Sequence, residues 1–240
     1  MRPLRLSAFG GSDIGRRSLN EDRFLVDHFA SIYAVADGMG SCEGGEVASG
    51  IAVQTLNRFF TQVGTAADGN SEIREARMDM AFRMAHHEVK KRRIGHLKEM
   101  GTTLVALRVD SDRRAVISHV GDSRIYRLRG GRLVSLTRDH SLVADMEAAG
   151  IPRAQRVMHR HVLTRALGVT EPRQDTQTLS LEPGDRFLLC SDGLTSQVSD
   201  RRIASIMSAA PDQMIVPALI SEAWRNDACD NTTAVVVLVD

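Results

Sequence analysis

The apolar segments of this sequence are short and come in blocks of one kind, and this order restricts the fold more than any other feature. Short apolar, partly β-branched segments at 23–29 and 31–36 predict a β-hairpin, and apolar residues at helical spacing follow from residue 46. The next block predicts four strands, at 102–109, 113–121, 124–129 and 132–136. Such segregated blocks indicate layers of an α+β fold and not the regular alternation of a doubly wound parallel sheet.

Two helices are predicted between these blocks. The core-facing residues expected for them are Ala48, Ile51, Ala52, Leu56, Phe59 and Phe60 in the first and Ile73, Ala76, Met80 and Met84 in the second. The four strands that follow are joined by short turns, which predicts an antiparallel meander. Further along, the patterns predict a helix at 142–150, buried strands at 185–191 and 232–239, and two short helices within 199–225.

Charge and length exclude several classes of function. The 240 residues include 31 Lys+Arg and 30 Asp+Glu, so the formal net charge is +1 and neither nucleic acid nor an anionic membrane is an expected partner. No apolar segment reaches the roughly 18 residues that cross a bilayer, so we expect no membrane insertion. Without a long linker, we expect one domain over residues 1–240. The cysteines Cys42, Cys190 and Cys229 show no C-x-x-C spacing, which favours a reducing cytoplasmic location.

Acidic residues recur at the ends of the predicted strands. They are Glu21, Asp22, Asp37, Asp122, Asp192 and Asp230. Any one of them could be only a turn former, because Asp and Gly favour turns for backbone reasons. As a set, they predict carboxylates that project from rigid strands into one cleft, and oxygen ligands of this kind suit Mg²⁺ or Mn²⁺.

The motifs of several other catalytic or metal-binding sites are absent or have the wrong residue spacing. A cysteine-dependent phosphatase needs Arg six residues after its nucleophile, but Ala48, Ser196 and Val235 stand at these positions. The sequence has no P-loop and no H-E-x-x-H zinc motif. The acidic triplet at 110–112 fails as an EF-hand because Arg114 takes a ligand position, and it predicts a hairpin turn instead.

Eight short segments, in order, carry a resemblance to a known family. They are RSLNED at 17–22, ADGMG at 36–40, GTT at 101–103, GDSR at 121–124, LTRDH at 136–140, LTRALG at 163–168, SDGL at 191–194 and DNTT at 230–233. The chain resembles the metal-dependent protein phosphatase 2C (PP2C, or PPM) family of serine/threonine phosphatases, in its compact bacterial branch. The resemblance implies a four-layer α-β-β-α sandwich with two central antiparallel sheets and a two-metal centre at one end.

The resemblance also implies roles for the site residues. Asp37 would bridge two Mn²⁺ or Mg²⁺ ions, Gly38 would offer its carbonyl oxygen to one of them, and Asp22 would belong to the coordination shell of that same ion. Asp192 and Asp230 would hold the other ion. Asp122 would bind a third, weaker ion, Glu21 would stand beside the ligands, and Arg17 would grip the substrate phosphate. A water shared by two such cations can attack phosphorus in line, and a guanidinium binds phosphate through two parallel donors.

The sequence departs from the family at the acidic loop. Met39 stands where many eukaryotic members have a His that could serve as general acid. Ser41 and Cys42 follow, where the bacterial form usually continues with Gly and His. Cys42 is therefore either a tolerated small residue or a redox-sensitive thiol near the metals.

Three readings of the function follow. The first is hydrolysis of phosphoserine and phosphothreonine in proteins, opposing a bacterial serine/threonine kinase. The second is a catalytically silent module that binds phosphoproteins, but such a module should lose metal-site acids, which are all present here. The third is a hydrolase of small phosphate esters, which would share the metal centre and differ at its rim.

Residues 150–163 match the mobile flap of bacterial relatives in position. Pro152 and the concentration of basic and titratable side chains predict an exposed loop. These side chains are Arg153, Arg156, His159, Arg160 and His161. We expect the segment to select phosphoprotein substrates, with a solvated connector as the structural alternative.

Overall fold

Two antiparallel sheets form the centre of the computed structural model, which describes residues 4–40, 44–63, 70–159, 162–171 and 173–240. The first sheet contains, in order, β1 (Leu6–Asp13), β12 (Thr232–Val239), β11 (Arg186–Cys190), β8 (Arg124–Arg129) and β9 (Arg132–Ser135). The second contains β10 (Asp175–Ser180), β7 (Arg114–Val120), β6 (Leu104–Val109), β3 (Ile32–Ala36) and β2 (Arg23–Asp27). A small ladder pairs β4 (Gly38–Met39) with β5 (Gly101–Thr102).

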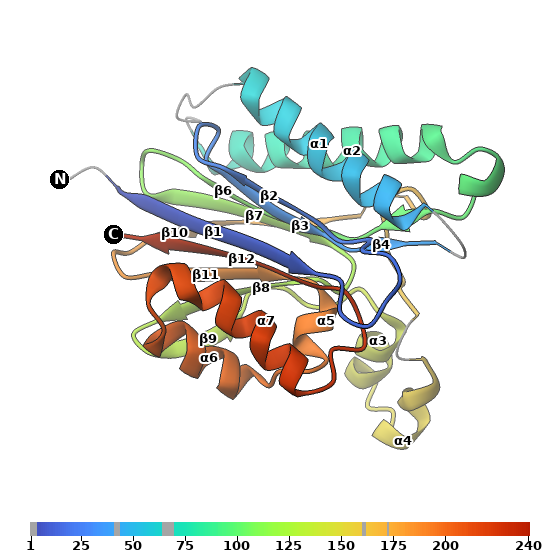
Figure 1. Ribbon diagram of the computed structural model, residues 1–240. Coiled ribbons are helices and arrows are strands. Elements are labelled where there is room, and N and C mark those ends of the chain that lie inside the picture. Colours follow the sequence, from blue (N-terminus) through green and yellow to red (C-terminus); the bar gives the residue numbers. More distant parts are fainter. Residues whose placement is uncertain (1–3, 41–43, 64–69, 160–161, 172) are drawn as a thin grey trace.

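Helices cover the outer face of each sheet (Figure 1). The long helices α1 (Gly45–Val63) and α2 (Ser71–Arg92) pack on the second sheet, and a 3₁₀ turn, η1 (Gly95–Leu97), follows them. The first sheet is covered by α5 (Asp192–Thr195), α6 (Asp200–Ala209), η3 (Asp212–Met214) and α7 (Ile215–Arg225). The layer order is therefore helix, sheet, sheet, helix, which confirms the four-layer sandwich expected from the resemblance.

Three apolar cores hold the layers together. Tyr33, Val105, Ile117, Phe187 and Val235 pack between the two sheets, and each is at most 2% exposed. Separate clusters lie under α1 and α2 and under α6 and α7. Because strand side chains alternate between faces, β3, β6, β11 and β12 each contribute to two cores. This explains why these strands read as continuous apolar segments.

The predicted four-stranded meander is wrong at its middle connection. β6 pairs with β7 in the second sheet, whereas β8 pairs with β9 in the first, so the chain crosses between the sheets at residues 121–123. Gly121 has φ +101°, a conformation that side chains rarely adopt, and the turn there redirects the chain. From the sequence, residues 121–123 resemble an ordinary hairpin turn, because Gly and Asp occur both in such turns and in this crossing. The crossing carries Asp122.

The predicted core face of the second helix is also wrong. Ile73, Met80 and Met84 are between 39% and 57% exposed, although the helix itself forms as expected. The buried face contains Arg74 and His86 together with Met78, Ala81, Phe82, Ala85 and Val89. Arg74 donates from Nε to Asp110 Oδ2 at 2.8 Å and also pairs with Asp112, so a salt bridge ties the helix to the β6–β7 turn. Because Arg74 and His86 are polar residues on the buried face, the spacing of apolar residues in the sequence indicates the wrong face of this helix.

Strands β1 and β10 were not predicted. β1 lacks a clear alternation because Gly10 and Gly11 stand at its centre, where a Cβ would lie 2.6 Å from Phe24 and 2.9 Å from Val216. β10 is mostly polar, because hydroxyl groups of Thr176 and Thr178 bond Asp79 and Glu75 of α2.

Residues 150–163, expected as a loop, contain helical turns. α3 (Leu142–Ala148) precedes the segment, and α4 (Arg153–Arg156) and η2 (Val157–His159) lie within it. The proline at 152 fits a helix that begins directly after it. Arg160 and His161 lie outside the described residues.

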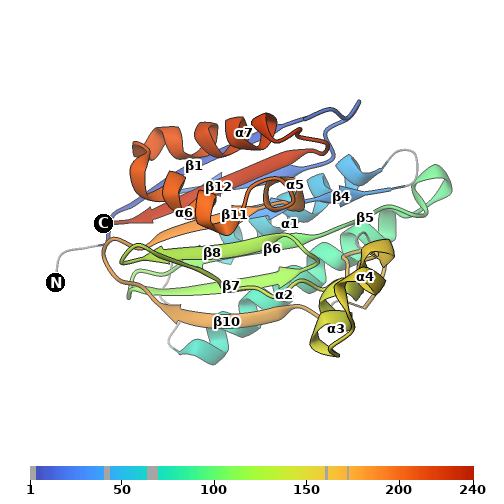
Figure 2. The ribbon, with the colours of Figure 1, turned by 90° about the horizontal axis from the view of Figure 1, so that it is seen from below.

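One end of the sandwich gathers the connections that matter for function. β4, α5, α3 and α4 lie at the end opposite the two chain termini (Figures 1 and 2). Within the described residues, no helix is both long enough and apolar enough to cross a membrane.

Candidate metal centre

Five predicted acidic residues come from separate connections at this end of the sandwich. Asp22 precedes β2, Asp37 links β3 to β4, Asp122 lies on the crossing, Asp192 begins α5 and Asp230 precedes β12. Their charges interact, since Asp37 is affected by all four of the others. The structure therefore brings together residues that are up to 208 positions apart in the sequence, from Asp22 to Asp230.

Burial and the clustering of negative charge raise the pKa values of three of these groups. Burial, followed by the charges of Asp22 and Asp192, raises the pKa of Asp37 well above its usual value. Burial and Asp192 raise the pKa of Asp122 to about 7, and burial raises the pKa of Asp22 to about 6. Carboxylates in such surroundings are stabilised by protons or by cations.

Asp22 offers an oxygen that no protein group satisfies. The residue is 2% exposed, and Oδ2 accepts a hydrogen bond from Ser191 Oγ at 2.7 Å. Oδ1 is buried and has no hydrogen-bond partner. A buried charged oxygen without a partner is costly, so this atom is a candidate ligand.

The backbone around Asp37 is held firmly. The Asp37 N–H donates to Thr103 Oγ1 at 3.0 Å, and the Asp37 carbonyl accepts from the Thr103 N–H and from Thr102 Oγ1, each at 2.9 Å. Gly38 must be glycine, because a Cβ there would lie 2.1 Å from the carbonyl oxygen of Gly45. The main chain at 37–38 thus sits close against the start of α1.

Glu21 stabilises this site mainly through its backbone. Its N–H donates to Asn231 Oδ1 at 2.8 Å, and its carbonyl oxygen accepts from Ser49 Oγ at 2.5 Å and from the Gly38 N–H at 3.2 Å. The carboxylate lies against the start of α1, where a Cβ on Gly45 would be 2.2 Å from Oε1. Burial, followed by the charge of Glu46, raises the pKa of Glu21.

Arg17 lies at the rim of the acidic group. Its Nη2 donates to Asp230 Oδ2 at 2.6 Å, and the two side chains are 56% and 40% exposed. Glu21 and Asp192 also act on its charge. The guanidinium is therefore beside the carboxylates and open to solvent, where an anionic group can approach.

A small recess adjoins Asp122 and Asp192. It has a volume of about 210 Å³, and Arg124, Asp139 and Ser141 contribute to its wall. Arg124 binds Asp139 through two parallel hydrogen bonds of 2.8 Å, which fixes the wall. A larger hollow of about 800 Å³ lies between β1 and α7, and none of the predicted site residues line it.

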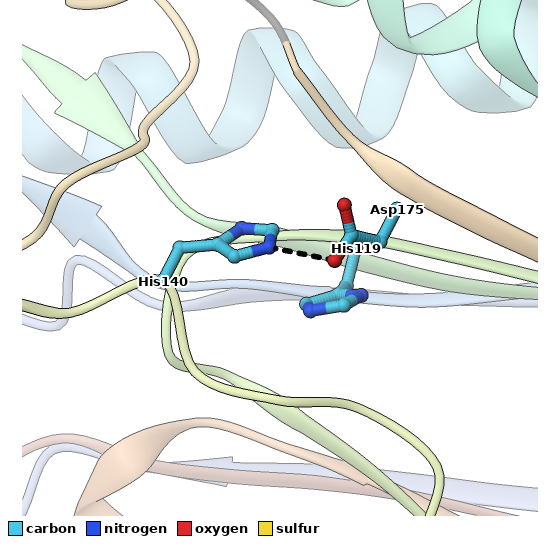
Figure 3. Close-up of side chains that lie close together, drawn as sticks. All are labelled: His119, His140 and Asp175. Carbon is cyan, nitrogen blue, oxygen red and sulfur yellow. Dashed lines mark hydrogen bonds and ion pairs between the residues drawn. The ribbon is translucent and has the colours of Figure 1, made fainter. Parts of the chain in front are cut away.

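A second group of potential ligands lies nearby, in His119, His140 and Asp175 (Figure 3). Among the described residues, this is the one group of three whose ligand atoms all lie within 4.8 Å of one another. Three of the four ring nitrogens already have hydrogen-bond partners. His119 Nε2 donates to the Arg138 carbonyl at 2.9 Å, and His140 Nδ1 accepts from the Gly121 N–H at 3.3 Å, which leaves the proton of neutral His140 on Nε2, facing Asp175.

The hydrogen bonds of this group favour a structural role. A metal at His140 Nε2 would need a proton on Nδ1, where the Gly121 N–H already points. Arg165 Nη1 also donates to Asp175 Oδ1 at 2.9 Å and neutralises its charge. The rings of His119 and His140 stack with centroids 4.4 Å apart.

Several residues of the site were not singled out from the sequence. Thr103, Ser191 and Asn231 hold Asp37, Asp22 and Glu21, and Arg124 and Asp139 hold the recess. All five lie inside the eight segments quoted above. Met39 lies on β4, as its place after Gly38 requires. Cys42 lies outside the described residues.

Comparisons with known proteins agree on the family. The chain matches the family described as Protein phosphatase 2C over residues 9–216. The protein phosphatase PhpP of Streptococcus pneumoniae is 32% identical over 243 residues, which covers 94% of each chain. The serine/threonine phosphatase stp of Listeria welshimeri is 37% identical, over 82% of this chain and 81% of that protein.

A solved structure gives the same result. The catalytic domain of the serine/threonine phosphatase PstP, determined with two manganese ions, superimposes with a TM-score of 0.87 at 32% identity, over 98% of this chain and 99% of that one. With the sandwich and the acidic group at its end, these matches place the chain among metal-dependent phosphatases. It belongs to the protein phosphatase 2C family.

Proposed function

We propose that this protein removes phosphate from phosphoserine and phosphothreonine in proteins, with divalent cations as cofactors. The observation that carries the proposal is the gathering of Asp22, Asp37, Asp122, Asp192 and Asp230 at one end of the sandwich. Burial and the neighbouring negative charges disfavour the charged forms of the first three. Divalent cations relieve that repulsion. Arg17 at the rim supplies the positive group that an anionic substrate needs.

The residues present fit a centre for hard cations. The donors are carboxylates and a main-chain carbonyl, and the unpartnered Asp22 Oδ1 is a buried oxygen available to an ion. We assign Asp37 to both ions, Gly38 and Asp22 to one, and Asp192 and Asp230 to the other, with Asp122 as the ligand of a third. Mn²⁺ and Mg²⁺ both suit this donor set. When bound, the ions would supply Lewis acidity, which activates a water and offsets charge on the phosphate.

The residues of the chain position the substrate. Arg17 offers parallel N–H donors that match two phosphate oxygens, and its exposed guanidinium can turn from Asp230 towards an incoming phosphate. The Met39 side chain has no proton to donate. Another group must therefore protonate the serine or threonine oxygen that is released from the phosphate.

The substrate is selected beside the centre. α4, within the segment 150–163, lies at the same end of the sandwich as β4 and α5, which suits a surface that contacts the protein part of a phosphoprotein (Figure 1). A serine/threonine kinase that makes these phosphoproteins is the expected opposing enzyme. The location we expect is the cytoplasm, where reduced cysteines persist.

Substitution of the acidic residues tests the proposal. Asp37→Asn and Asp192→Asn should each reduce kcat on a phosphothreonine peptide by at least about tenfold, which is about 1.4 kcal/mol of barrier. Asp212→Asn is the matched control, because Asp212 is an exposed acid paired with Arg186 on the far side of the first sheet. Circular dichroism checks that each variant is folded. If both Asn variants retain activity close to that of the control, the proposed centre is wrong.

A further inference from the structure

Thr103 contacts two parts of the acidic group at once. It lies between β5 and β6, and its side chain is 1% exposed. It holds both backbone groups of Asp37, since it accepts from the Asp37 N–H at 3.0 Å and donates its own N–H to the Asp37 carbonyl at 2.9 Å. Together with Thr102 Oγ1, which also donates to the Asp37 carbonyl, Thr103 fixes the Asp37 main chain.

The same side chain holds the crossing that carries Asp122. Thr103 Oγ1 lies 2.7 Å from Ser123 Oγ, and Ser123 is 1% exposed. The methyl group of Thr103 packs against Gly121, where a Cβ would lie 2.5 Å from Thr103 Cγ2. Thr103 thus contacts the residue before Asp122 and the residue after it.

His140 holds the other side of the crossing. Its N–H donates to the Gly121 carbonyl at 2.9 Å, and its Nδ1 accepts from the Gly121 N–H. Asp175 faces His140 Nε2 and fixes the ring (Figure 3). The backbone at 121–123 is consequently fixed between Thr103 and His140, and Asp122 has little freedom to move away from Asp37.

We propose that Thr103 is a positioning residue that sets the separation of Asp37 and Asp122 through its hydroxyl group, and so tunes cation binding by both. The two carboxylates repel each other, and the contact between the buried hydroxyl groups of Thr103 and Ser123 holds together the two segments that carry them. The inference rests on the proposed function only in taking Asp37 and Asp122 as cation ligands. Partners that orient ligands commonly change metal affinity by about tenfold to a hundredfold.

Matched variants separate the hydroxyl group from the methyl group. Thr103→Val keeps the shape and removes the oxygen, whereas Thr103→Ser keeps the oxygen and removes the methyl contact with Gly121. Ser123→Ala removes the other half of the hydroxyl pair and leaves the Asp37 N–H bonded to Thr103. Ser118→Ala is the control, because Ser118 Oγ is fully buried and bonds Thr176 Oγ1 at 2.9 Å between β7 and β10.

The measurement is calorimetric titration of each folded variant with Mn²⁺ alone. We expect Thr103→Val to weaken Mn²⁺ binding by about tenfold or more, Ser123→Ala to weaken it by a smaller factor, and Thr103→Ser to remain within about threefold of the unsubstituted protein. Ser118→Ala should not change Mn²⁺ binding. Unchanged binding in Ser123→Ala would overturn the proposal, and this outcome can be read even if Thr103→Val fails to fold.

A double-mutant cycle tests the link between the two carboxylates. If Thr103 acts on both, Ser123→Ala should have little further effect on Mn²⁺ binding once Asp122→Ala has removed the ligand from the crossing. If the losses of Mn²⁺ affinity caused by Ser123→Ala and Asp122→Ala simply add in the double variant, the proposed link is wrong. Because the readout is Mn²⁺ binding, failure here differs from failure of the proposed function, which would appear as absent phosphopeptide hydrolysis by the unsubstituted protein.

Discussion

At Asp22 and Asp122, proton binding competes with cation binding near neutral pH. Burial raises their pKa values to about 6 and about 7, so both carry protons for part of the time at pH 6. A cation can bind only the deprotonated carboxylate. At the residue scale, the pH therefore sets how strongly the centre binds its ions.

We predict that Mn²⁺ binds about tenfold more tightly at pH 8 than at pH 6 and that binding at pH 6 releases protons. The sign follows from the raised pKa values, because the protonated form that excludes the cation dominates below them. Titration calorimetry in two buffers with different ionisation enthalpies measures the released protons. The number should fall in Asp122→Asn, and affinity that is independent of pH would contradict the prediction.

Arg17 gives a second prediction at this scale. Arg17→Ala should raise KM for a phosphothreonine peptide more than it lowers kcat, because a group that binds phosphate acts on the bound substrate as well as on the transition state. Arg17→Lys should not restore KM, since an ammonium lacks the paired donors of a guanidinium. Arg16→Ala is the control, because Arg16 is similarly exposed and pairs with Asp227. Equal KM values for Arg17→Ala and Arg16→Ala in steady-state kinetics would contradict the role of Arg17.

The sequence predicts the acids of the site better than their supports. Asp37, Asp122 and Asp192 stand out because each directly follows an apolar strand or a tight turn. Thr103, Ser191 and Asn231 are small polar residues, and the partners that define their roles lie 20 or more positions away along the chain. Only the folded backbone brings these partners together, so their roles could not be read from local pattern.

At the scale of elements, the connections carry more of the function than the strands do. The crossing at 121–123 places Asp122 between the sheets, and α3 and α4 extend from the same end (Figure 2). At least one basic side chain of the segment 150–163, which the sequence suggests as a flap, forms a salt bridge within the fold and is not free for substrate. Arg156 Nη1 pairs with Glu147 Oε1 at 3.0 Å, and its side chain is only 15% exposed, so it joins α4 to α3.

We predict that Arg156→Ala loosens the flap and lowers kcat/KM on a phosphoprotein several-fold. Turnover of p-nitrophenyl phosphate should stay within about twofold, because a small ester needs only the interactions at the centre. Glu147→Ala should act in the same direction, since it removes the other half of the pair. Equal losses on both substrates would mean that the segment supports the metal centre, and no loss on either would favour a solvated connector.

Element types were predictable where one face is apolar and the other polar. α1 formed with the expected core face, including Ala48, Leu56 and Phe60. α2 did not, because Arg74 is buried by its salt bridge to Asp110 and no periodicity of apolar residues marks it. The predicted meander is wrong because the prediction assumes that strands adjacent in the sequence pair with each other. The β7–β8 connection instead joins two different sheets.

At the scale of the whole molecule, the two-sheet sandwich is a rigid base that holds repelling acids together. The cores between and outside the sheets bury large apolar side chains, and their stability offsets the cost of gathering buried carboxylates at one end. The net charge of the chain is only +1, so the negative charge at this end is a local feature. Cations are the groups that this local charge is suited to bind.

The most direct test of this account is hydrolysis of a phosphothreonine peptide by protein whose metal content has been removed by chelation and verified by elemental analysis. The account predicts no turnover by the metal-free protein and recovery when Mn²⁺ or Mg²⁺ is added. Asp37→Asn should not recover under the same conditions. Full activity of the verified metal-free protein would contradict the account.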